Sequence, residues 1–365
     1  MRTFRAARWI TAAAALTIVL GLAAPPARGE TELLGPLRIR DMTPFNLLRL
    51  DMLPAHAVSA APGSWAIEAD LSYSNTFVMS DNVQSYLEAR GGRRPLTQAD
   101  ADAILGLGQD AYYVDGEFGL LDLTFHYGIT RRSSVYLTLS AYDFTGGFLD
   151  GTIEGFHKTF GLDTNGRGLV ARNRFQGVLS IEGVRTSFLA PPIDRGLGDP
   201  VFGLRHAWPL RGSRWGLVLD GAAKIAWRGE RLFLSTGTDD YGLQASLQGK
   251  FTRQAVYLSA SAVRTDGRVF GVELKQRVIP TLTAAYEVGV TGHTNLIMQL
   301  YASRSTIQDT TIDQLKADKY QASLGLRSLR GHLVYGFAVT ENVENFANTP
   351  DIGVSLTLAW IALRS

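Results

Sequence analysis

The chain has 365 residues, of which 19% are charged and 10% aromatic, and its formal net charge is +2. This composition excludes a disordered chain. Cysteine is absent, which excludes disulfides, thiolate metal sites and a cysteine nucleophile. The 38 glycines indicate many turns or close contacts between strands.

The first 29 residues have the three parts of a secretory signal peptide. Three arginines among the first eight residues precede an apolar run, and Ala27-Arg28-Gly29 supplies small residues for cleavage before Glu30. The alternative is a membrane anchor, but the run of about fifteen residues is shorter than the roughly 20 that a spanning helix needs. Cleavage removes four arginines and changes the formal charge from +2 to −2, which leaves no case for nucleic-acid binding.

Residues 30–62 show no clear alternation of apolar and polar residues and contain four prolines. This segment is expected to be an N-terminal extension. Two places remain open for it, the periplasmic side of the molecule or the lumen of the domain that follows.

From residue 63 to the end of the chain, apolar and polar residues alternate in twelve segments. The clearest runs from Trp215 to Trp227 and carries Asp220 and Lys224 on its polar side. It spans roughly 40 Å at about 3.3 Å per residue. A tilt of about 45° reduces this to roughly 28 Å, close to the apolar band of about 25 Å of a membrane barrel. The segments are 65–73, 121–127, 135–141, 202–208, 215–227, 241–251, 256–262, 282–290, 296–302, 320–326, 333–339 and 352–360.

The links between these segments are alternately short and long, as in bacterial outer-membrane barrels. Unpaired backbone groups are not tolerated in lipid, so such strands must close on themselves. We therefore predict an all-β fold, a transmembrane antiparallel β-barrel of about 12 strands formed by residues 63–365. The alternative, a secreted β-sandwich, would bury the apolar faces and needs neither such long strands nor aromatic residues at both ends of the apolar face.

Two of the long links are predicted to contain short helices at the extracellular side. In the first, Thr97 is a plausible N-cap and Gly106 or Gly108 a plausible end. In the second, Ile153, Phe156 and Phe160 have helical spacing. The second helix is expected to pack on the barrel rim or to fold inward as a partial plug, and a ligand contact is the alternative.

Strand parity separates two sets of candidate functional residues. Charged residues of both signs fall on the inward side, where Asp220 and Lys224 lie within reach of each other or of Arg205 and Lys250. The lumen-facing candidates are Glu68, Asp70, Asp122, His126, Arg205, Asp220, Lys224, Lys250, Glu287 and Arg327. Aromatic residues of the outward side gather near strand ends, as lipid-interface anchors do. These candidates are Trp65, Tyr73, Trp208, Trp215, Trp227, Tyr241, Phe251 and Trp360.

No catalytic or cofactor motif is present. The six histidines lack metal-ligand spacing, and there is no Walker loop, nucleophile elbow or dinucleotide fingerprint in context, so we expect neither a metal nor a cofactor. Twelve-stranded outer-membrane phospholipases use a serine and a histidine on the lipid-facing side. Here His206 points outward, but the next strand along the chain offers no outward serine, so an interfacial histidine is the favoured interpretation and a hydrolase the remote alternative.

Four stretches resemble an uncharacterised proteobacterial outer-membrane family, domain of unknown function 3187. They are GPLRIRDMTP, GFHKTFGL, GLGDP and TENVENFANTPDIGVSL. The resemblance covers essentially the whole mature chain and implies an outer-membrane barrel, but no activity. The last strand also resembles the signal read by the barrel-assembly machinery, which usually ends in an aromatic residue. Here Trp360 is followed by Ile-Ala-Leu-Arg-Ser, which leaves the end of the strand uncertain.

The favoured function is a narrow channel or uptake protein for small solutes in the outer membrane of a Gram-negative bacterium. A twelve-stranded barrel is wider than an eight-stranded one, whose interior side chains can fill, and narrower than a porin of 16–18 strands. The alternative is a non-conducting structural barrel, or one that binds a ligand or partner. The expected partners are outer-membrane lipid and, during biogenesis, the barrel-assembly machinery, and the solute cannot be named from the sequence.

Overall fold

The computed structural model describes residues 32–55, 62–161, 163–210, 214–273, 277–344 and 349–361. The predicted signal peptide, residues 1–29, lies outside the described residues. Within the described ranges, no helix is long and apolar enough to cross a membrane.

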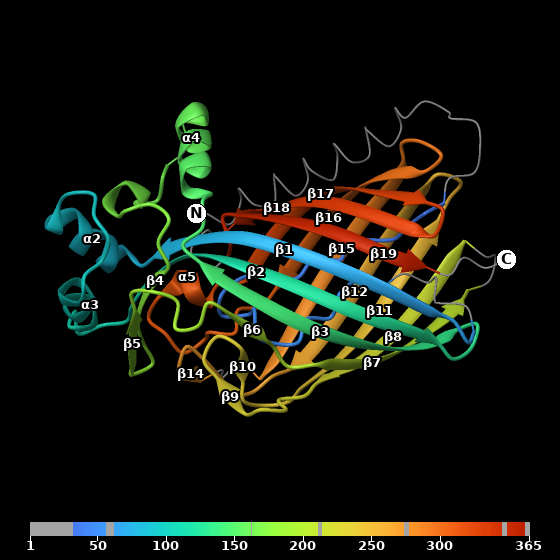
Figure 1. The fold of residues 1–365 in the computed structure, drawn as a ribbon, viewed down its shortest axis with the longest axis horizontal. Helices are drawn as coiled ribbons and strands as arrows, with labels where there is room; N and C mark the ends of the chain where they lie inside the picture. Colours follow the sequence, from blue (N-terminus) through green and yellow to red (C-terminus); the bar gives the residue numbers. More distant parts are fainter. Residues whose placement is uncertain are drawn as a thin grey trace.

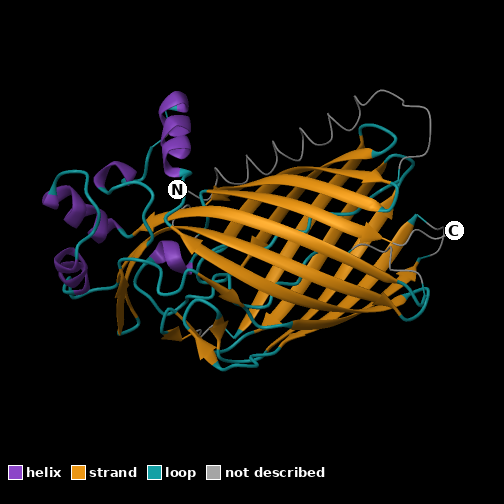
Figure 2. Cartoon of the chain, in the orientation of Figure 1, coloured by secondary structure: helices purple, strands orange, loops and turns teal. Residues whose placement is uncertain are grey.

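Twelve antiparallel strands close into a barrel (Figures 1 and 2). Closure is made by β1 and β19, where Ala66 pairs with Ile361 and Asn75 with Ile352. The predicted fold class is confirmed. The wall consists of β1 (Trp65–Met79), β2 (Ala111–Gly128), β3 (Ser133–Thr145), β7 (Val201–Pro209), β8 (Trp215–Lys224), β11 (Asp240–Lys250), β12 (Gln254–Arg264), β15 (Val278–Gly289), β16 (Thr294–Ser303), β17 (Lys319–Arg330), β18 (Leu333–Glu344) and β19 (Ile352–Ile361).

Residues that alternate between apolar and polar in the sequence alternate between the outer and inner faces of the wall. In β11, Tyr241 and Leu243 are exposed on the outside, whereas Gln244 and Ser246 are buried on the inside. The same period of two holds in β8, but this strand ends at Lys224, three residues before Trp227. The prediction of a strand from Trp215 to Trp227 was therefore wrong at its end, because the chain turns after Lys224, where the backbone N–H of Trp227 bonds to the carbonyl of Ile225.

The long links carry the remaining elements at one end of the barrel, on the left of Figure 1. The hairpin of β4 and β5 continues the wall past the end of β3, where β4 pairs with the first five residues of β2, and β6 pairs with β3. The helices are α2 (Asp81–Arg90), α3 (Gln98–Leu105), α4 (Asp150–Phe160), the 3-10 turn η1 (Arg167–Leu169) and α5 (Asp313–Lys316). The short strands are β4 (Gln176–Ile181), β5 (Val184–Phe188), β6 (Arg195–Leu197), β9 (Glu230–Arg231), β10 (Ser235–Thr236), β13 (Arg268–Val269) and β14 (Val272–Glu273).

These links pack into two apolar cores rather than remaining as loose loops. One core joins α2 and α3 to the outward side chains Phe77 and Tyr113, and so covers β1 and β2 beyond the membrane-spanning part of the wall. The other lies at the long-link end of the barrel, where residues 42–48 and inward side chains of the wall pack against aromatic rings from successive links. Its phenylalanines from the links are Phe175, Phe188, Phe233 and Phe270.

The helix predicted after Thr97 is α3, and its N-terminus has a complete capping box. The Thr97 backbone N–H donates to Asp100 at 2.8 Å, and Tyr86 and Arg94 donate to the same carboxylate at 2.9 Å. Burial of Asp100 works against its charge, but these hydrogen bonds hold its pKa well below the ordinary value.

We expect Asp100→Asn to loosen α3, because the Asp100 carboxylate accepts the Thr97 backbone N–H in the capping box, and a capping hydrogen bond is worth about 1 kcal/mol. The measurement is hydrogen exchange of residues 97–105 in the whole chain. A carboxyl group whose pKa is lower in the folded chain than in the unfolded chain stabilises the fold at a pH above its unfolded pKa, near 4. This stabilisation is lost as the pH falls through the folded pKa. Protection of α3 should therefore fall in acid in the native chain. Equal protection in both proteins at neutral pH would contradict the assignment.

Candidate functional site

Residues 32–55 lie inside the barrel and form a lumenal hairpin (Figure 1). The rising limb begins near the short turns, where the backbone N–H groups of Leu34 and Gly35 donate to Glu287 at 2.6 and 3.1 Å. At the far end, Phe45 enters the aromatic core of the long links. The returning limb descends to Ala55, which packs on the inside of β7 and β8. The hairpin thus occupies the barrel from one end to the other.

The tip of the hairpin is a hydrogen-bonded turn built around Asp41. Its carboxylate accepts the backbone N–H of Thr43 at 3.0 Å and the side-chain amide of Asn46 at 2.5 Å. The backbone N–H of Asp41 in turn donates to Asp51 on the opposite limb at 2.9 Å. Asp41 therefore fixes both the turn and the spacing of the two limbs.

Four buried charges hold this tip against the wall. Asp41 pairs with Lys319 of β17 and lies 3.9 Å from Arg49, which is 3.8 Å from Asp51. All four side chains are at most 4% exposed. Arg49 also donates to the hydroxyl of Tyr301 in β16 at 3.0 Å. Because each buried charge depends on its partners, loss of one leaves the others uncompensated.

Polar contacts continue along both limbs. Arg38 pairs with Glu68 at 3.2 Å, and Arg40 pairs with Asp122 at 3.2 Å. Lys224 donates to the carbonyl of Leu48 at 2.9 Å. The wall contributes a side chain to each of these contacts. Ion pairs and hydrogen bonds therefore hold the hairpin together with apolar contacts along both limbs, where Leu37 packs on β12 and β16 and Leu50 on β8 and β12.

The structure places the ten inward candidates as follows. Five contact the hairpin: Glu68, Asp122, Lys224, Glu287 and Arg327, the last donating to the carbonyls of Leu34 and Pro36. The other five lie against the wall itself. Arg205 pairs with Asp220 at 2.7 Å, and Asp70 accepts a hydrogen bond from Thr357. His126 lies 3.7 Å from Glu68, and Lys250 is half-buried at the end of β11. Asp220 and Lys224 do not pair with each other, because Lys224 reaches Asp240 at 2.9 Å instead.

The eight aromatic candidates fall at the two ends of the wall. Those at the short-turn end are exposed: Trp65, Trp208, Trp215, Phe251 and Trp360. Those toward the long links are Tyr73, which is half-buried, and the exposed Tyr241 and Trp227. Trp227 lies in the link after β8, with the guanidinium of Arg228 4.2 Å from its ring.

One side of the hairpin does not fill the lumen. A gap of about 20 Å³, with room for about one water molecule, lies between Ile39, Arg40 and Met42 and the wall formed by β1, β17, β18 and β19. The wall side of this gap is rich in hydroxyl groups. Its inward-facing polar residues are Ser72, Ser74, Gln321, Thr340 and Ser355. The Oγ of Ser74 is buried and has no hydrogen-bond partner among the described residues.

The returning limb packs directly on a glycine of the wall. A Cβ added to Gly242 would lie 2.6 Å from the Sδ of Met52 and 3.0 Å from a methyl group of Leu50. We expect Gly242→Val to push this limb inward, at a cost of about 1–3 kcal/mol for overpacking. Hydrogen exchange of residues 49–55 should become faster. Gly221→Ala is the matched control, because its added Cβ lies 3.5 Å from Leu243 on the outer surface.

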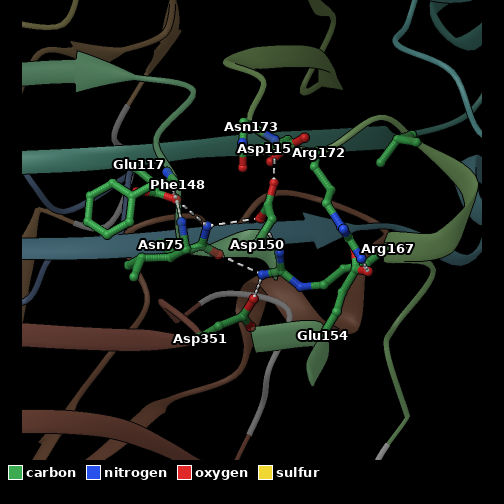
Figure 3. A network of polar contacts seen from close by, with 12 residues as sticks. Asn75, Asp115, Glu117, Phe148, Asp150, Glu154, Arg167, Arg172, Asn173 and Asp351 are labelled. Carbon is green, nitrogen blue, oxygen red and sulfur yellow. Dashed lines mark hydrogen bonds and ion pairs between the residues drawn. The ribbon is translucent and has the colours of Figure 1, made fainter. Parts of the chain in front are cut away.

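A polar network lies on the outer side of the wall at β1, just beyond Tyr73 (Figure 3). Arg167 donates to Asp150 at 2.6 Å, to Asn75 of β1 at 2.6 Å, and to Asp351 before β19. Glu117 of β2 accepts from the backbone N–H of the residue before α4, Leu149, at 2.7 Å. The network ties the link of residues 146–200 to the seam between β1 and β19.

The outward surface also contains a serine beside His206. Ser133 Oγ in β3 lies 2.9 Å from His206 Nδ1, and the His206 ring packs on Trp208 with centroids 4.1 Å apart. The prediction compared His206 only with β8, whereas the serine stands on the other neighbouring strand. Among the described residues no carboxylate or amide bonds to Nε2 of His206, and no group of three or more acidic or histidine side chains could hold a metal ion.

The fold is similar to solved outer-membrane proteins at low sequence identity. The COG4313 outer-membrane channel from Pseudomonas putida F1 gives a TM-score of 0.51 at 12% identity, over 86% of this chain and 100% of that chain. The NanC porin gives 0.41 at 7% identity, over 82% and 100%. A Pseudomonas aeruginosa FadL homologue gives 0.37 at 10% identity, over 90% and 100%. No functionally curated protein matches the chain.

A family model matches residues 89–360, from the last turn of α2 into β19. The matched part contains GFHKTFGL, GLGDP and TENVENFANTPDIGVSL, three of the four stretches on which the predicted resemblance rested. The lumenal hairpin and β1 lie before it. The resemblance is confirmed: the chain belongs to the family described as proteins of unknown function, DUF3187.

Proposed function

We propose that the protein is a gated channel for small polar solutes, with the lumenal hairpin as its gate. The single observation that carries this proposal is the way the hairpin is held. Its limbs bond to the wall through ion pairs and hydrogen bonds, and a gap remains along β1, β17, β18 and β19. Polar contacts of this kind can be exchanged for contacts with water, so the cost of moving the hairpin lies mainly in the apolar area that its two limbs bury.

The lining of the gap supports solutes that carry hydroxyl or amide groups. Serine, threonine and glutamine side chains donate and accept hydrogen bonds without imposing a charge. Of the charged residues beside the gap, Arg40 is paired with Asp122, and Glu341 lies on the outer face of β18 opposite Ile352. A lining dominated by neutral polar groups supports weak ion selectivity. The similar fold from P. putida F1 belongs to an outer-membrane channel, which is in keeping with this proposal.

Planar-bilayer recording tests the proposal directly. The purified full chain is compared with a chain that lacks residues 32–55. We expect small or infrequent current steps from the full chain and larger, frequent steps without the hairpin. If neither protein conducts, the proposal is wrong and the non-conducting barrel is favoured.

The Ser133–His206 pair supports a second, weaker candidate, a lipid hydrolase. A serine and a histidine at 2.9 Å have the separation that a nucleophile and its base require. However, no acid or amide orients the histidine among the described residues, and such a group completes the usual triad. A phospholipase assay with Ser133→Ala and His206→Ala as controls decides the question. Activity lost in both variants would establish the hydrolase, and no activity in the native chain would exclude it.

A further inference from the structure

Helix α4 exposes large apolar side chains that none of the described residues covers. Only Asp150 and Ile153 of α4 are buried, and the backbone just before the helix bonds to Glu117 of β2, so of the two expected positions α4 takes the barrel rim and not that of an inward plug. Phe156 and Phe160 are 49% and 65% exposed, with ring centroids 4.6 Å apart. They share one helix face with Ile153, since their spacings are three and four residues. Phe148, just before the helix, is 68% exposed.

The helix begins at the level where the apolar outer wall ends. The ring of Phe148 stacks on Tyr73, an outward residue of β1, at 5.7 Å between centroids. Below this level β1 exposes Ile67 and Leu71. Asn75, the next outward residue above it, is 1% exposed and bonds to Arg167. A wall that is apolar and exposed up to Tyr73 and polar and covered beyond it marks the border between lipid and headgroups.

The charges around α4 fix which way its apolar face points. Glu154 pairs with Arg93, in the link between α2 and α3, and with Arg172 at 2.6 Å. Burial works against the charge of Glu154, yet the two guanidinium groups lower its pKa to about 2. The acidic face therefore points toward α2 and α3, away from the spanning part of the barrel. Phe156 and Phe160 lie on the other side of the helix, and Figure 1 shows α4 standing across the long direction of the barrel.

We propose that Phe148 and α4 form an interfacial anchor, whose apolar face lies in the outer leaflet beside the barrel. Helices with one aromatic face and one charged face lie in the plane of the membrane interface in this way. The surface is continuous with the lipid-facing wall through the contact between Phe148 and Tyr73. Lys158, one turn after Glu154, is exposed on the polar side of the helix and faces water.

The absence of cysteine makes spin labelling a clean test, because each introduced cysteine is unique. The full chain, reconstituted in phosphatidylcholine vesicles, is labelled at Phe156→Cys or Phe160→Cys. Leu121→Cys on the exposed wall is the lipid reference, and Lys158→Cys is the water reference. We expect labels 156 and 160 to be relaxed several-fold more by oxygen than by a water-soluble nickel chelate, as is expected for label 121. At label 158 the nickel chelate should be the more effective of the two.

Two results would overturn the proposal. If labels 156 and 160 respond to nickel as label 158 does, the helix stands in water. If both oxygen and nickel are excluded there, the face packs on protein, such as a second copy of the chain. Heat-modified migration on gels confirms that each variant is a folded barrel.

A second measurement keeps the native phenylalanines in place. Thr152→Cys lies on the flank of the apolar face, and its label is compared in the native background and with Phe156→Ser and Phe160→Ser together. We expect the ratio of oxygen to nickel accessibility at 152 to fall several-fold in the double variant. An unchanged ratio would show that the aromatic side chains do not hold the helix in lipid.

Discussion

Replacing Asp41 by alanine is expected to release the lumenal hairpin and to raise single-channel conductance several-fold. Asp41 pairs with Lys319 and accepts the hydrogen bonds that shape the turn. Without it, Lys319 and Arg49 remain buried, like-charged and short of a carboxylate. Removing one partner from a buried ion pair typically costs about 3–5 kcal/mol. The lowest-cost escape is movement of the tip away from Lys319, because the barrel strands are held by their own backbone ladder.

The measurement is planar-bilayer current, combined with hydrogen exchange of residues 32–55. Both should rise in Asp41→Ala. Ser246→Ala is the matched control, since its hydroxyl bonds only across the wall, to Ser259 at 2.8 Å, and its loss costs about 1 kcal/mol. An increase in exchange without any increase in current would show that the hairpin can leave its site without opening a path, and would count against the gate.

The barrel could be predicted from the sequence because its physical cause is local. A wall between lipid and a polar interior imposes a period of two on every strand, and the strands carry it residue by residue. The end of β8 was missed because Ile225 and Trp227 continue the apolar pattern although the chain turns there. The cap of α3 was equally local, since Thr97 and Asp100 are three residues apart.

The partners of the inward charges could not be predicted from parity. Parity predicts that Glu287 faces the lumen. It does not predict that the Glu287 carboxylate accepts the backbone N–H of Leu34, which is 253 residues away in sequence. Arg38, Arg40 and Arg49 were missed altogether, because residues 30–62 show no period. One signal was present: the segment carries several arginines and aspartates beside a barrel with charges of both signs inside. Charge complementarity of this kind favours the lumen over the periplasm for the segment.

Replacing Arg167 by methionine should detach the link of residues 146–200 from the barrel rim. Arg167 is 3% exposed and bonds to Asp150, Asn75 and Asp351, so the variant leaves two carboxylates buried without their cation. The expected loss is about 3–5 kcal/mol, seen as a lower thermal unfolding midpoint and faster proteolysis of the link. Arg172→Met is the matched control. Its side chain is half-exposed and, among the described residues, pairs with Glu154 alone, and exposed pairs contribute about 0–1 kcal/mol.

The defect of Arg167→Met should shrink as the pH falls. Burial raises the pKa of Asp351, and in the native protein the Arg167 guanidinium opposes this rise. Without Arg167 the pKa rises further, so the folded variant binds a proton more readily than the unfolded chain does. Stability of the variant relative to the native protein must then increase as the pH falls from the folded pKa of Asp351 in the variant to its lower folded pKa in the native protein. A difference in unfolding midpoint that stays constant between pH 7 and about pH 5 would show that the loss comes from packing of Arg167 on Phe77, 4.6 Å from its guanidinium, rather than from charge.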